Sequence, residues 1–218
     1  MNETPSLVLY SDTYWVSSYV FSCFVALREK GLTFEVREVA LEEGAHKKPE
    51  YHARSITARV PALEHDGFFL GESSAIVEYL DDVFPVPHDR RLLPEAPRDR
   101  ARARQIMAWI RSDLTALRAE RPTTTIFYSP TDAPLTSAGR ADADKLIHVA
   151  DLLIPEEGTS LFGGWSIADS DLALMLQRLL SNGHELRPKV RRYVEVQWAR
   201  PSVREFVERE RPTFVPYG

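Results

Sequence analysis

The sequence has almost no cysteine and no long apolar run, and each shortage excludes a class of protein. Its 218 residues include one cysteine, Cys23, which excludes an internal disulfide framework and the C-x-x-C pair of a disulfide reductase. No apolar stretch is long enough to span a bilayer. Met1 leads directly into polar residues without a signal-peptide pattern. We therefore expect a soluble cytoplasmic protein that does not enter a membrane.

Basic residues and metal-binding patterns are also scarce. Lysine and arginine total 27 against 32 aspartates and glutamates, and this formal charge of −5 argues against nucleic acid or an anionic membrane as the main partner. The six histidines are scattered, with no pair at metal-ligand spacing. The G-x-S-x-G elbow typical of Ser-His-Asp hydrolases is absent. We therefore expect no nucleic-acid partner and no metal.

What the chain does have is the length and the apolar content of two modest domains. Hydrophobic residues make up 44% of the sequence, which is enough for two cores. Four prolines close together indicate a linker, so we predict domains at 1–86 and 98–218 joined by a linker at 87–97. In the second domain, apolar residues recur at helical spacing and predict one long helix through 101–117, with a loop at 123–138.

The first domain has a βαβ order followed by a ββα order. Residues 6–10 are typical of a buried strand, which Ser11 and Asp12 end, and the helix that follows closes at Gly31. After a second strand, a polar and irregular segment covers residues 42–59. This order of elements is the thioredoxin-like one.

Val60-Pro61 opens the next strand. Proline has no amide hydrogen for a sheet, so Pro61 belongs at a strand start, where the backbone groups of Val60 stay free. A cis bond here would bend the chain and present the Val60 amide and carbonyl to an extended ligand, and the sequence leaves the isomer open. Asp66-Gly67 then predicts a two-residue hairpin.

Glu72 and Ser73 stand where a helix begins. Apolar residues recur at helical spacing from Ala75 to Val83. The unpaired amides at the helix start suit a carboxylate, and the Glu72 side chain suits an ammonium group. Taken singly these features are more often structural, but together they predict a site that binds one end of an amino acid or a peptide.

In this order and spacing, Val60-Pro61 and Glu72-Ser73 are similar to the glutathione site of the glutathione S-transferases. The resemblance implies an α/β thioredoxin-like N-terminal domain, with the order βαβ-ββα, and an all-α C-terminal domain. It also implies that glutathione is the co-substrate and that the working form is a homodimer. The chemistry would be conjugation of glutathione to small electrophiles, with reduction of organic hydroperoxides as a plausible second activity.

Three stretches extend the resemblance into the predicted C-terminal domain. Residues 166–169 match the S/T-x-x-D capping box that opens the core helix of transferase second domains, and we interpret Asp169 as structural. Residues 100–105 and 111–114 look like those of the bacterial YfcF-like subgroup. The resemblance therefore covers nearly the whole chain.

The resemblance assigns roles to individual residues. The Val60 backbone would pair with the cysteine of glutathione, and Glu72 with Ser73 would hold its γ-glutamyl end. Lys47 and Arg59 lie in or beside the irregular segment where the family commonly binds the glycine carboxylate, and both are candidates for that role. Charged residues in such a loop are more often simply solvated.

Ser17-Ser18-Tyr19 occupies the place where serine-type members carry a serine that donates its hydroxyl hydrogen to the glutathione sulfur. Ser17 aligns best with that serine, and Ser18 stays an alternative because the family's proline is missing. Weaker candidates are Tyr10, Ser11 and Tyr14. A free thiol has a pKa of roughly 8.5, and lowering it to near 7 takes about 2 kcal/mol. One hydrogen bond to a charged group, worth about 1.5 to 3 kcal/mol, supplies that stabilisation.

Several alternatives stay open on the sequence. Transferase-like folds also serve as non-catalytic binding or regulatory proteins, and a hydrolase or lyase of glutathione adducts would use the same thiolate site. Arg111 and Arg118 either lie on a solvated helix face, which is the better interpretation, or attract an acidic co-substrate. Aromatic candidates for the second pocket, which are at least as often core residues, are Trp15, Trp109, Phe127 and Tyr128.

Overall fold

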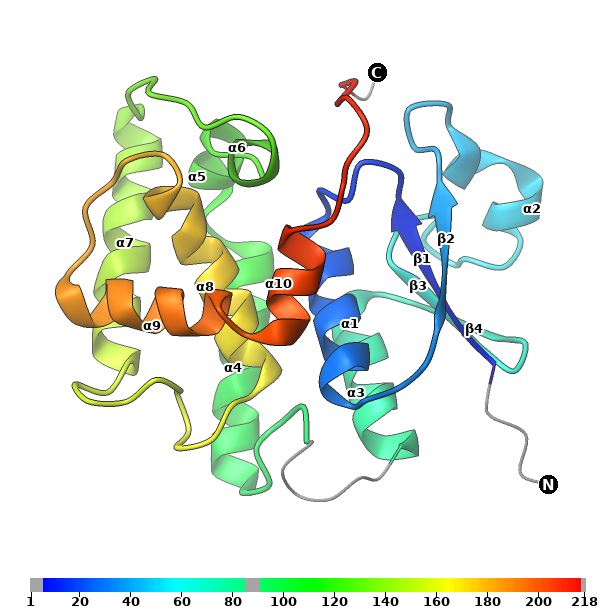
Figure 1. Ribbon diagram of the computed structural model, residues 1–218, viewed down its shortest axis with the longest axis horizontal. Coiled ribbons are helices and arrows are strands. Elements are labelled where there is room, and N and C mark those ends of the chain that lie inside the picture. Colours follow the sequence, from blue (N-terminus) through cyan, green and yellow to red (C-terminus); the bar gives the residue numbers. More distant parts are fainter. Residues whose placement is uncertain (1–5, 85–90, 217–218) are drawn as a thin grey trace. The chain divides into compact units, whose positions relative to one another are not determined.

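Two compact units make up the chain. The computed structural model describes residues 6–84 and 91–216 (Figure 1). One unit comprises Met1–Leu92 together with Glu208–Gly218, and the other comprises Leu93–Val207. The C-terminal segment from Glu208 thus belongs to the first unit, although nothing in the sequence separates it from the helices before it. The predicted linker lies partly outside the described residues.

A four-stranded sheet forms the centre of the first unit. Its strands are β1 (Leu7–Asp12), β2 (Glu35–Val39), β3 (Ala62–His65) and β4 (Phe68–Gly71). They lie in the order β2-β1-β3-β4, with β2 parallel to β1 and the other two pairs antiparallel. The predicted βαβ-ββα order is confirmed. The first strand runs two residues further than expected, because Ser11 and Asp12 are completely buried and pair with β2.

Each face of the sheet has its own cover. Helices α1 (Ser18–Glu29) and α3 (Ser73–Val83) pack together on one face (Figure 1). Val8 and Tyr10 alternate to the opposite face, where they pack with residues of the segment after β2. This segment contains a 3₁₀ turn, Ala45–Lys47, and the short α2 (Pro49–His52). The sequence predicts an irregular segment here, without these two short helical turns.

Two turns in this unit confirm their predictions. Asp66 and Gly67 both have positive φ, +48° and +85°, as a type I′ hairpin requires. Gly31 follows α1 with a φ of +68°, and its amide donates to the Arg28 carbonyl. Both turns depend on backbone angles that glycine adopts without strain.

The second unit is helical throughout its described secondary structure, and the predicted all-α domain is confirmed. Its helices are α4 (Pro97–Ser112), α5 (Thr115–Glu120), α6 (Thr124–Phe127), α7 (Ser137–Leu153), α8 (Ile167–Leu180), α9 (Pro188–Trp198) and α10 (Pro201–Val207). Helix α8 is buried along almost its whole length, as its apolar sequence predicts. Within the described residues, no helix combines the length and the apolar character needed to cross a membrane.

The predicted long helix through residues 101–117 is wrong, because the chain breaks between α4 and α5. Leu114 has a φ of +59°, which a helix cannot contain. The Asp113 carboxylate holds the break by accepting from the Leu114 amide at 2.8 Å and from Trp109 Nε1 at 2.9 Å, and it also binds Lys145. Apolar periodicity continues across the break, so the sequence pattern conceals it.

These contacts make Asp113 a source of acid sensitivity. Hydrogen bonds from Lys145, the Leu114 amide and Trp109 lower the pKa of Asp113 from 3.8 to about 2. A lowered pKa stabilises the folded chain above the ordinary value, and this contribution is lost as the pH falls toward 2. The side chain is 35% exposed, so solvent screening reduces the effect. Between pH 5 and pH 3 we expect wild type to lose roughly 0.5 kcal/mol more stability than Asp113→Asn.

Urea denaturation at the two pH values measures this difference. The exposed Asp144 lies on α7, and Asp144→Asn serves as the control that should behave like wild type. Equal losses in wild type and Asp113→Asn would show that the carboxylate does not stabilise the break.

Candidate functional site

The register of the sheet brings the predicted site segments to one edge. Tyr10 near the end of β1 pairs with Ala62 at the start of β3, and Ala62 pairs with Gly71 at the end of β4. Asp12 at the end of β1 pairs with Val39 at the end of β2. Strands β1, β2 and β4 therefore end, and β3 begins, at the same side of the sheet (Figure 1). We call this side, which runs across the ends of the strands, the β1 edge.

All the segments that carry predicted site residues adjoin the β1 edge. The loop to Ser17 follows β1, and Val60 lies two residues before β3. Glu72-Ser73 follows β4 directly. Lys47 and Arg59 belong to the segment that leaves β2 and returns to β3. Segments far apart in the sequence thus meet because three strand connections close at the same edge.

Val60 lies outside the hydrogen-bonded ladder. The Val60-Pro61 bond is cis, and pairing of β3 with both neighbours begins at Ala62. Among the described residues, the Val60 amide and carbonyl therefore take no part in the sheet. They remain available to a ligand that adds as an extended strand.

Glu72 and Ser73 form the start of α3 with an unusual backbone. Glu72 caps the helix with φ +65° and ψ +114°, a conformation that costs a non-glycine residue about 1 to 3 kcal/mol. Its side chain is exposed and makes no capping hydrogen bond, while Ser73 is buried at the first helical position. The Glu72 side chain therefore does not compete with an anionic ligand for the first turn of α3, and a helix start is a place where anions bind.

Ser17 caps the N-terminus of α1. Its Oγ accepts from the Val20 amide at 3.2 Å, and its side chain is half-buried. Because this contact uses an oxygen lone pair, the hydroxyl hydrogen is left to donate elsewhere. Ser18 follows as the first residue of the helix. The capping geometry thus suits Ser17 to donate to an anion at the helix start, where the helix dipole is positive.

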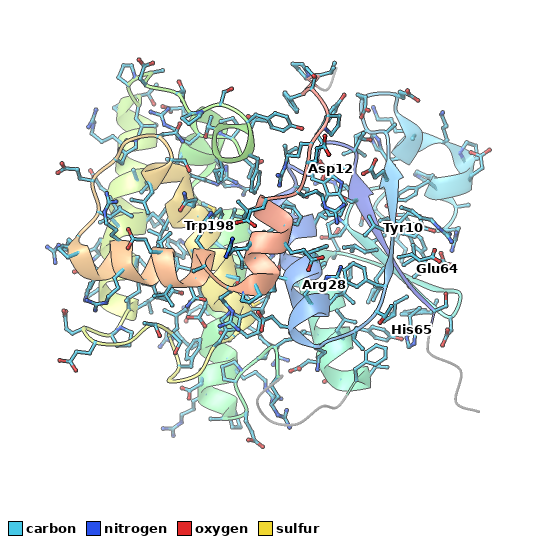
Figure 2. The ribbon with its side chains drawn as sticks, in the orientation of Figure 1. Tyr10, Asp12, Arg28, Glu64, His65 and Trp198 are labelled. Atoms are coloured by element: carbon cyan, nitrogen blue, oxygen red, sulfur yellow. The ribbon has the colours of Figure 1, made fainter. Side chains whose placement is uncertain are left out.

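Asp12 fixes the loop that carries Ser17, a role that was not predicted from the sequence. The side chain is completely buried. One carboxylate oxygen accepts from the Val16 amide at 2.8 Å and the other accepts from the Ser17 amide at 3.2 Å. Figure 2 shows Asp12 at the end of β1, where the chain turns toward α1. An aspartate between a strand and a helix-capping serine was the available signal, because aspartate side chains often bind nearby amides.

The tyrosine alternatives have other partners. Tyr10 donates its hydroxyl to Glu64 at 2.8 Å on the face of the sheet opposite α1 (Figure 2). Hydrogen bonds from Arg54 and Tyr10 lower the pKa of Glu64, so this carboxylate stays an acceptor. Burial, together with Glu42, raises the pKa of Tyr14. These contacts leave Ser17 as the better donor.

Lys47 and Arg59 are both exposed. Lys47 ends the 3₁₀ turn, where burial and the charge of Lys47 lower the pKa of the adjacent His46. The Arg59 carbonyl accepts from the Tyr51 hydroxyl at 2.7 Å, which fixes the backbone before Val60. Their predicted contact with a carboxylate stays a prediction.

The single cysteine, Cys23, lies in the interior of the first unit. Cys23 is completely buried, and its Sγ lies 3.8 Å from the Ser73 carbonyl, so it is a core residue. Across residues 6–84 and 91–216, no group of three or more histidine, cysteine, aspartate or glutamate side chains could hold a metal ion. The donor set at the β1 edge instead suits an organic ligand with carboxylate and ammonium groups.

In the second unit, the capping box before α8 is present as predicted. Ser166 donates from its amide at 2.8 Å and from its Oγ at 2.9 Å to Asp169, which also accepts from Leu161 and Tyr193. Asp169 is completely buried. Its role is structural.

The arginines and aromatic residues of this unit mostly serve its packing. Arg111 forms an ion pair of 2.9 Å with the buried Asp171, and Arg118 donates to the Arg111 carbonyl at 2.7 Å. These contacts favour a structural role over recruitment of an acidic co-substrate. Phe127 packs against Phe206. Trp109, with residues of α4 and α7, lines a groove of about 220 Å³.

Two domain families match this chain. The glutathione S-transferase N-terminal domain matches residues 16–83, and the glutathione S-transferase C-terminal domain matches residues 97–210. Each match falls largely within one of the two units. The two matches together account for most of the chain.

Individual relatives agree with these matches. A maleylacetoacetate isomerase of Dictyostelium discoideum is 32% identical over 173 residues, 78% of this chain and 77% of the relative. A maleylacetoacetate isomerase of Rattus norvegicus is 38% identical over 112 residues, and the chain spans about half the length of this and several other curated relatives.

Solved structures share the fold. A glutathione transferase homologue from Burkholderia gl BGR1 with bound glutathione is 46% identical, with a TM-score of 0.78 over 93% of this chain and 97% of that one. A theta class glutathione S-transferase from Xanthomonas axonopodis pv. citri with glutathione bound, 21% identical with a TM-score of 0.74 over 94% and 99% of the two chains, shares the fold. By its sequence matches and its fold, the chain belongs to the glutathione S-transferase family.

Proposed function

We propose that this protein is a glutathione-dependent enzyme that binds glutathione at the β1 edge and stabilises its thiolate with the Ser17 hydroxyl. The observation that carries the proposal is the meeting of Ser17, Val60 and Glu72-Ser73 around one edge of the sheet. The related Burkholderia structure with bound glutathione supports this ligand.

The three parts of glutathione match three features of the edge. The cysteine backbone would pair with the Val60 amide and carbonyl as an added strand. The γ-glutamyl carboxylate would accept from the Ser73 hydroxyl and from amides of the first turn of α3, while Glu72 would bind the ammonium group. Lys47 and Arg59 would attract the glycine carboxylate. In this arrangement the thiol would point toward the start of α1.

The Ser17 hydroxyl would then donate its hydrogen to the sulfur. A hydrogen bond to a charged group contributes about 1.5 to 3 kcal/mol, and the N-terminus of α1 adds roughly 0.3 to 1 kcal/mol. Lowering a thiol pKa from roughly 8.5 to near 7 requires about 2 kcal/mol. The two sources suffice for a thiolate at neutral pH, and the nucleophile is the ligand's own sulfur.

The bound thiolate supports more than one reaction. In conjugation, for example with an aryl halide, the thiolate attacks the electrophilic carbon, a carbon–sulfur bond forms, the carbon–halogen bond breaks with release of halide, and glutathione leaves as part of the thioether product. The Dictyostelium relative named as an isomerase favours a second candidate, in which the thiolate adds to a double bond conjugated with a carbonyl, the resulting single bond rotates, and elimination releases glutathione unchanged. Reduction of an organic hydroperoxide would consume two glutathiones per turnover.

The consumption of glutathione distinguishes these reactions. Conjugation consumes one glutathione per product, isomerisation consumes none, and hydroperoxide reduction consumes two. Measuring residual thiol against product for an aryl halide, a cis-configured conjugated diketo acid and an organic hydroperoxide assigns the activity. Absence of turnover with all three would favour the non-catalytic binding protein. The homodimer, the cytoplasmic location and the bacterial YfcF-like subgroup stay predictions.

Replacing Glu72 or Ser73 tests the binding site. We expect Glu72→Ala and Ser73→Ala each to weaken glutathione binding by about tenfold, because each removes a polar contact with a charged group of the ligand. Isothermal titration calorimetry measures the change. Asp82 is exposed on the same helix, and Asp82→Ala should bind like wild type.

Glu72→Gly separates binding from stability. Glycine adopts the positive φ of position 72 without strain. Glu72→Gly should therefore be about as stable as wild type and more stable than Glu72→Ala. It should nevertheless bind glutathione as weakly as Glu72→Ala. Unchanged binding in both Glu72 variants would contradict the assignment of the ammonium group to this carboxylate.

A further inference from the structure

The C-terminal segment, residues 208–216, packs on the loop that carries Ser17. The Arg209 guanidinium lies 3.7 Å from the centre of the Trp15 ring. Arg211 Nε donates to the Trp15 carbonyl at 3.4 Å, and Phe214 packs edge-on against Tyr14 with ring centres 5.2 Å apart. Three side chains of the segment thus contact two consecutive residues of the β1–α1 loop, all within the first unit.

Trp15 is held in a conformation that needs such support. It has a φ of +52° and is 1% exposed, and a positive φ is unfavourable for a bulky residue. Its indole Nε1 donates to Glu38 at 2.8 Å, and its ring packs edge-on against Phe24. Arg209 also contacts the ring directly, so residues of β2, α1 and the C-terminal segment all contact the Trp15 side chain.

Hydrogen bonds to Asp12 connect the backbone of Trp15 to that of Ser17. The Trp15 amide donates to the Asp12 carbonyl at 3.2 Å, and the next two amides donate to the Asp12 carboxylate. Ser17 lies two residues after Trp15 and caps α1. A change in the Trp15 backbone therefore displaces the Ser17 hydroxyl, whose hydrogen bond to a sulfur depends on direction as well as distance.

We propose that Arg209 is a positioning residue, which acts through Trp15 to hold the Ser17 hydroxyl in the direction of the glutathione sulfur. This inference rests on the proposed function, because it concerns the same thiolate. In this proposal Arg209 acts through its contact with the Trp15 ring and not on the ligand itself. The C-terminal segment then helps to position the loop that carries Ser17.

The segment has a second attachment at Tyr14. The Val215 backbone hydrogen-bonds to Tyr14, which also bonds to Glu42 of the segment after β2. Phe214 adds its ring contact to the same tyrosine. Loss of Arg209 alone should therefore loosen the contact with Trp15 while the rest of the segment stays attached through Tyr14.

A double-mutant cycle with two readouts tests the proposal. The variants are Arg209→Ala, Trp15→Phe and the combination of both, and the exposed Arg98 on α4 supplies the control Arg98→Ala. The first readout is hydrogen exchange of the Val16 and Ser17 amides in the free protein. The second is the pKa of the bound glutathione thiol, titrated by thiolate absorbance, with kcat and KM for glutathione.

For Arg209→Ala we expect faster exchange of both amides and a bound-thiol pKa raised by about one unit, from near 7 to near 8, which lowers the thiolate fraction at pH 7 and kcat about fivefold. KM for glutathione should change by less than about threefold, since the binding contacts are elsewhere. The double variant should show little more than Trp15→Phe alone, because the two residues act in one path. Arg98→Ala should match wild type in every measurement.

Two results would overturn the inference. If Arg209→Ala leaves the amide exchange unchanged, or lowers the melting temperature without changing the thiol pKa, Arg209 is only a stabilising contact. A wild-type protein without a thiolate signal would instead contradict the proposed function, and the inference would fall with it. The wild-type titration therefore distinguishes the two failures.

Discussion

Ser17→Ala is expected to lower glutathione-dependent turnover by about 10- to 100-fold while glutathione binding stays within about threefold of wild type. The variant loses the hydrogen bond to the thiolate, worth about 1.5 to 3 kcal/mol, which is about one to two units in the pKa of the bound thiol. The binding contacts at Val60 and Glu72 are unaffected. Steady-state kinetics and titration of the thiolate absorbance measure the two quantities.

The capping role of Ser17 makes controls necessary. Its Oγ accepts from the Val20 amide, so alanine also costs about 0.5 to 2 kcal/mol of stability. Ser17→Thr keeps both the cap and the hydroxyl and should retain most of the activity. Ser17→Asp keeps the cap but has no hydrogen to donate, so it should be stable and inactive.

Ser18 provides the comparison that resolves the remaining ambiguity. It is the first residue of α1 and makes no capping contact to the helix comparable with that of Ser17. Ser18→Ala should therefore keep a normal thiol pKa. If Ser18→Ala loses turnover and Ser17→Ala keeps it, the thiolate donor has been assigned to the wrong serine. If neither variant affects turnover, the non-catalytic alternative is favoured.

Asp169→Ala is expected to destabilise the second unit by about 4 kcal/mol and to lower the melting temperature by about 10 °C. The carboxylate accepts from the Ser166 amide and hydroxyl, the Leu161 amide and the Tyr193 hydroxyl, all within 3.0 Å. Its removal takes this acceptor from the Ser166 amide and hydroxyl and from the Leu161 amide, while the Tyr193 hydroxyl can still donate to the backbone carbonyl of residue 169. An unmade buried hydrogen bond costs about 1 to 3 kcal/mol. Calorimetric melting of the purified variant measures the loss.

Two further variants distinguish the capping box from a general effect of charge. Ser166→Ala removes a smaller part of the network and should cost about 1 kcal/mol, while Asp144→Ala removes an exposed aspartate of α7 and should change little. A melting temperature for Asp169→Ala within a degree or two of wild type would contradict the structural interpretation. Reassignment of Asp169 to catalysis would require a loss of turnover without a loss of stability.

The N-terminal unit was predictable because its signals are local. Asp66-Gly67 specifies a turn by its backbone angles, and Pro61 marks a strand start by its missing amide hydrogen. The pairing of Ala62 with Gly71 then follows from the hairpin, whereas the pairing of Tyr10 with Ala62 joins β1 to β3 and is not set by it. The β1 edge is where these local signals meet, while the ligand roles predicted for its residues came from the resemblance to the family.

Other features could not be predicted because they depend on tertiary contacts. Asp113 ends α4 by binding Trp109 and Lys145, and the apolar pattern runs through the break unchanged. The C-terminal segment carries no strand or helix pattern, so only its contacts with Tyr14 and Trp15 reveal its place. Asp12 was taken for a strand breaker, although its two oxygens hold the Ser17 loop.

The most direct test of the central claim is the ultraviolet titration of glutathione bound to the purified protein, with binding measured in parallel by calorimetry. The account predicts binding that weakens in Glu72→Ala and Ser73→Ala, and a thiolate signal near neutral pH that shifts to higher pH in Ser17→Ala. No binding at millimolar glutathione, or a thiol pKa that does not respond to Ser17, would contradict it.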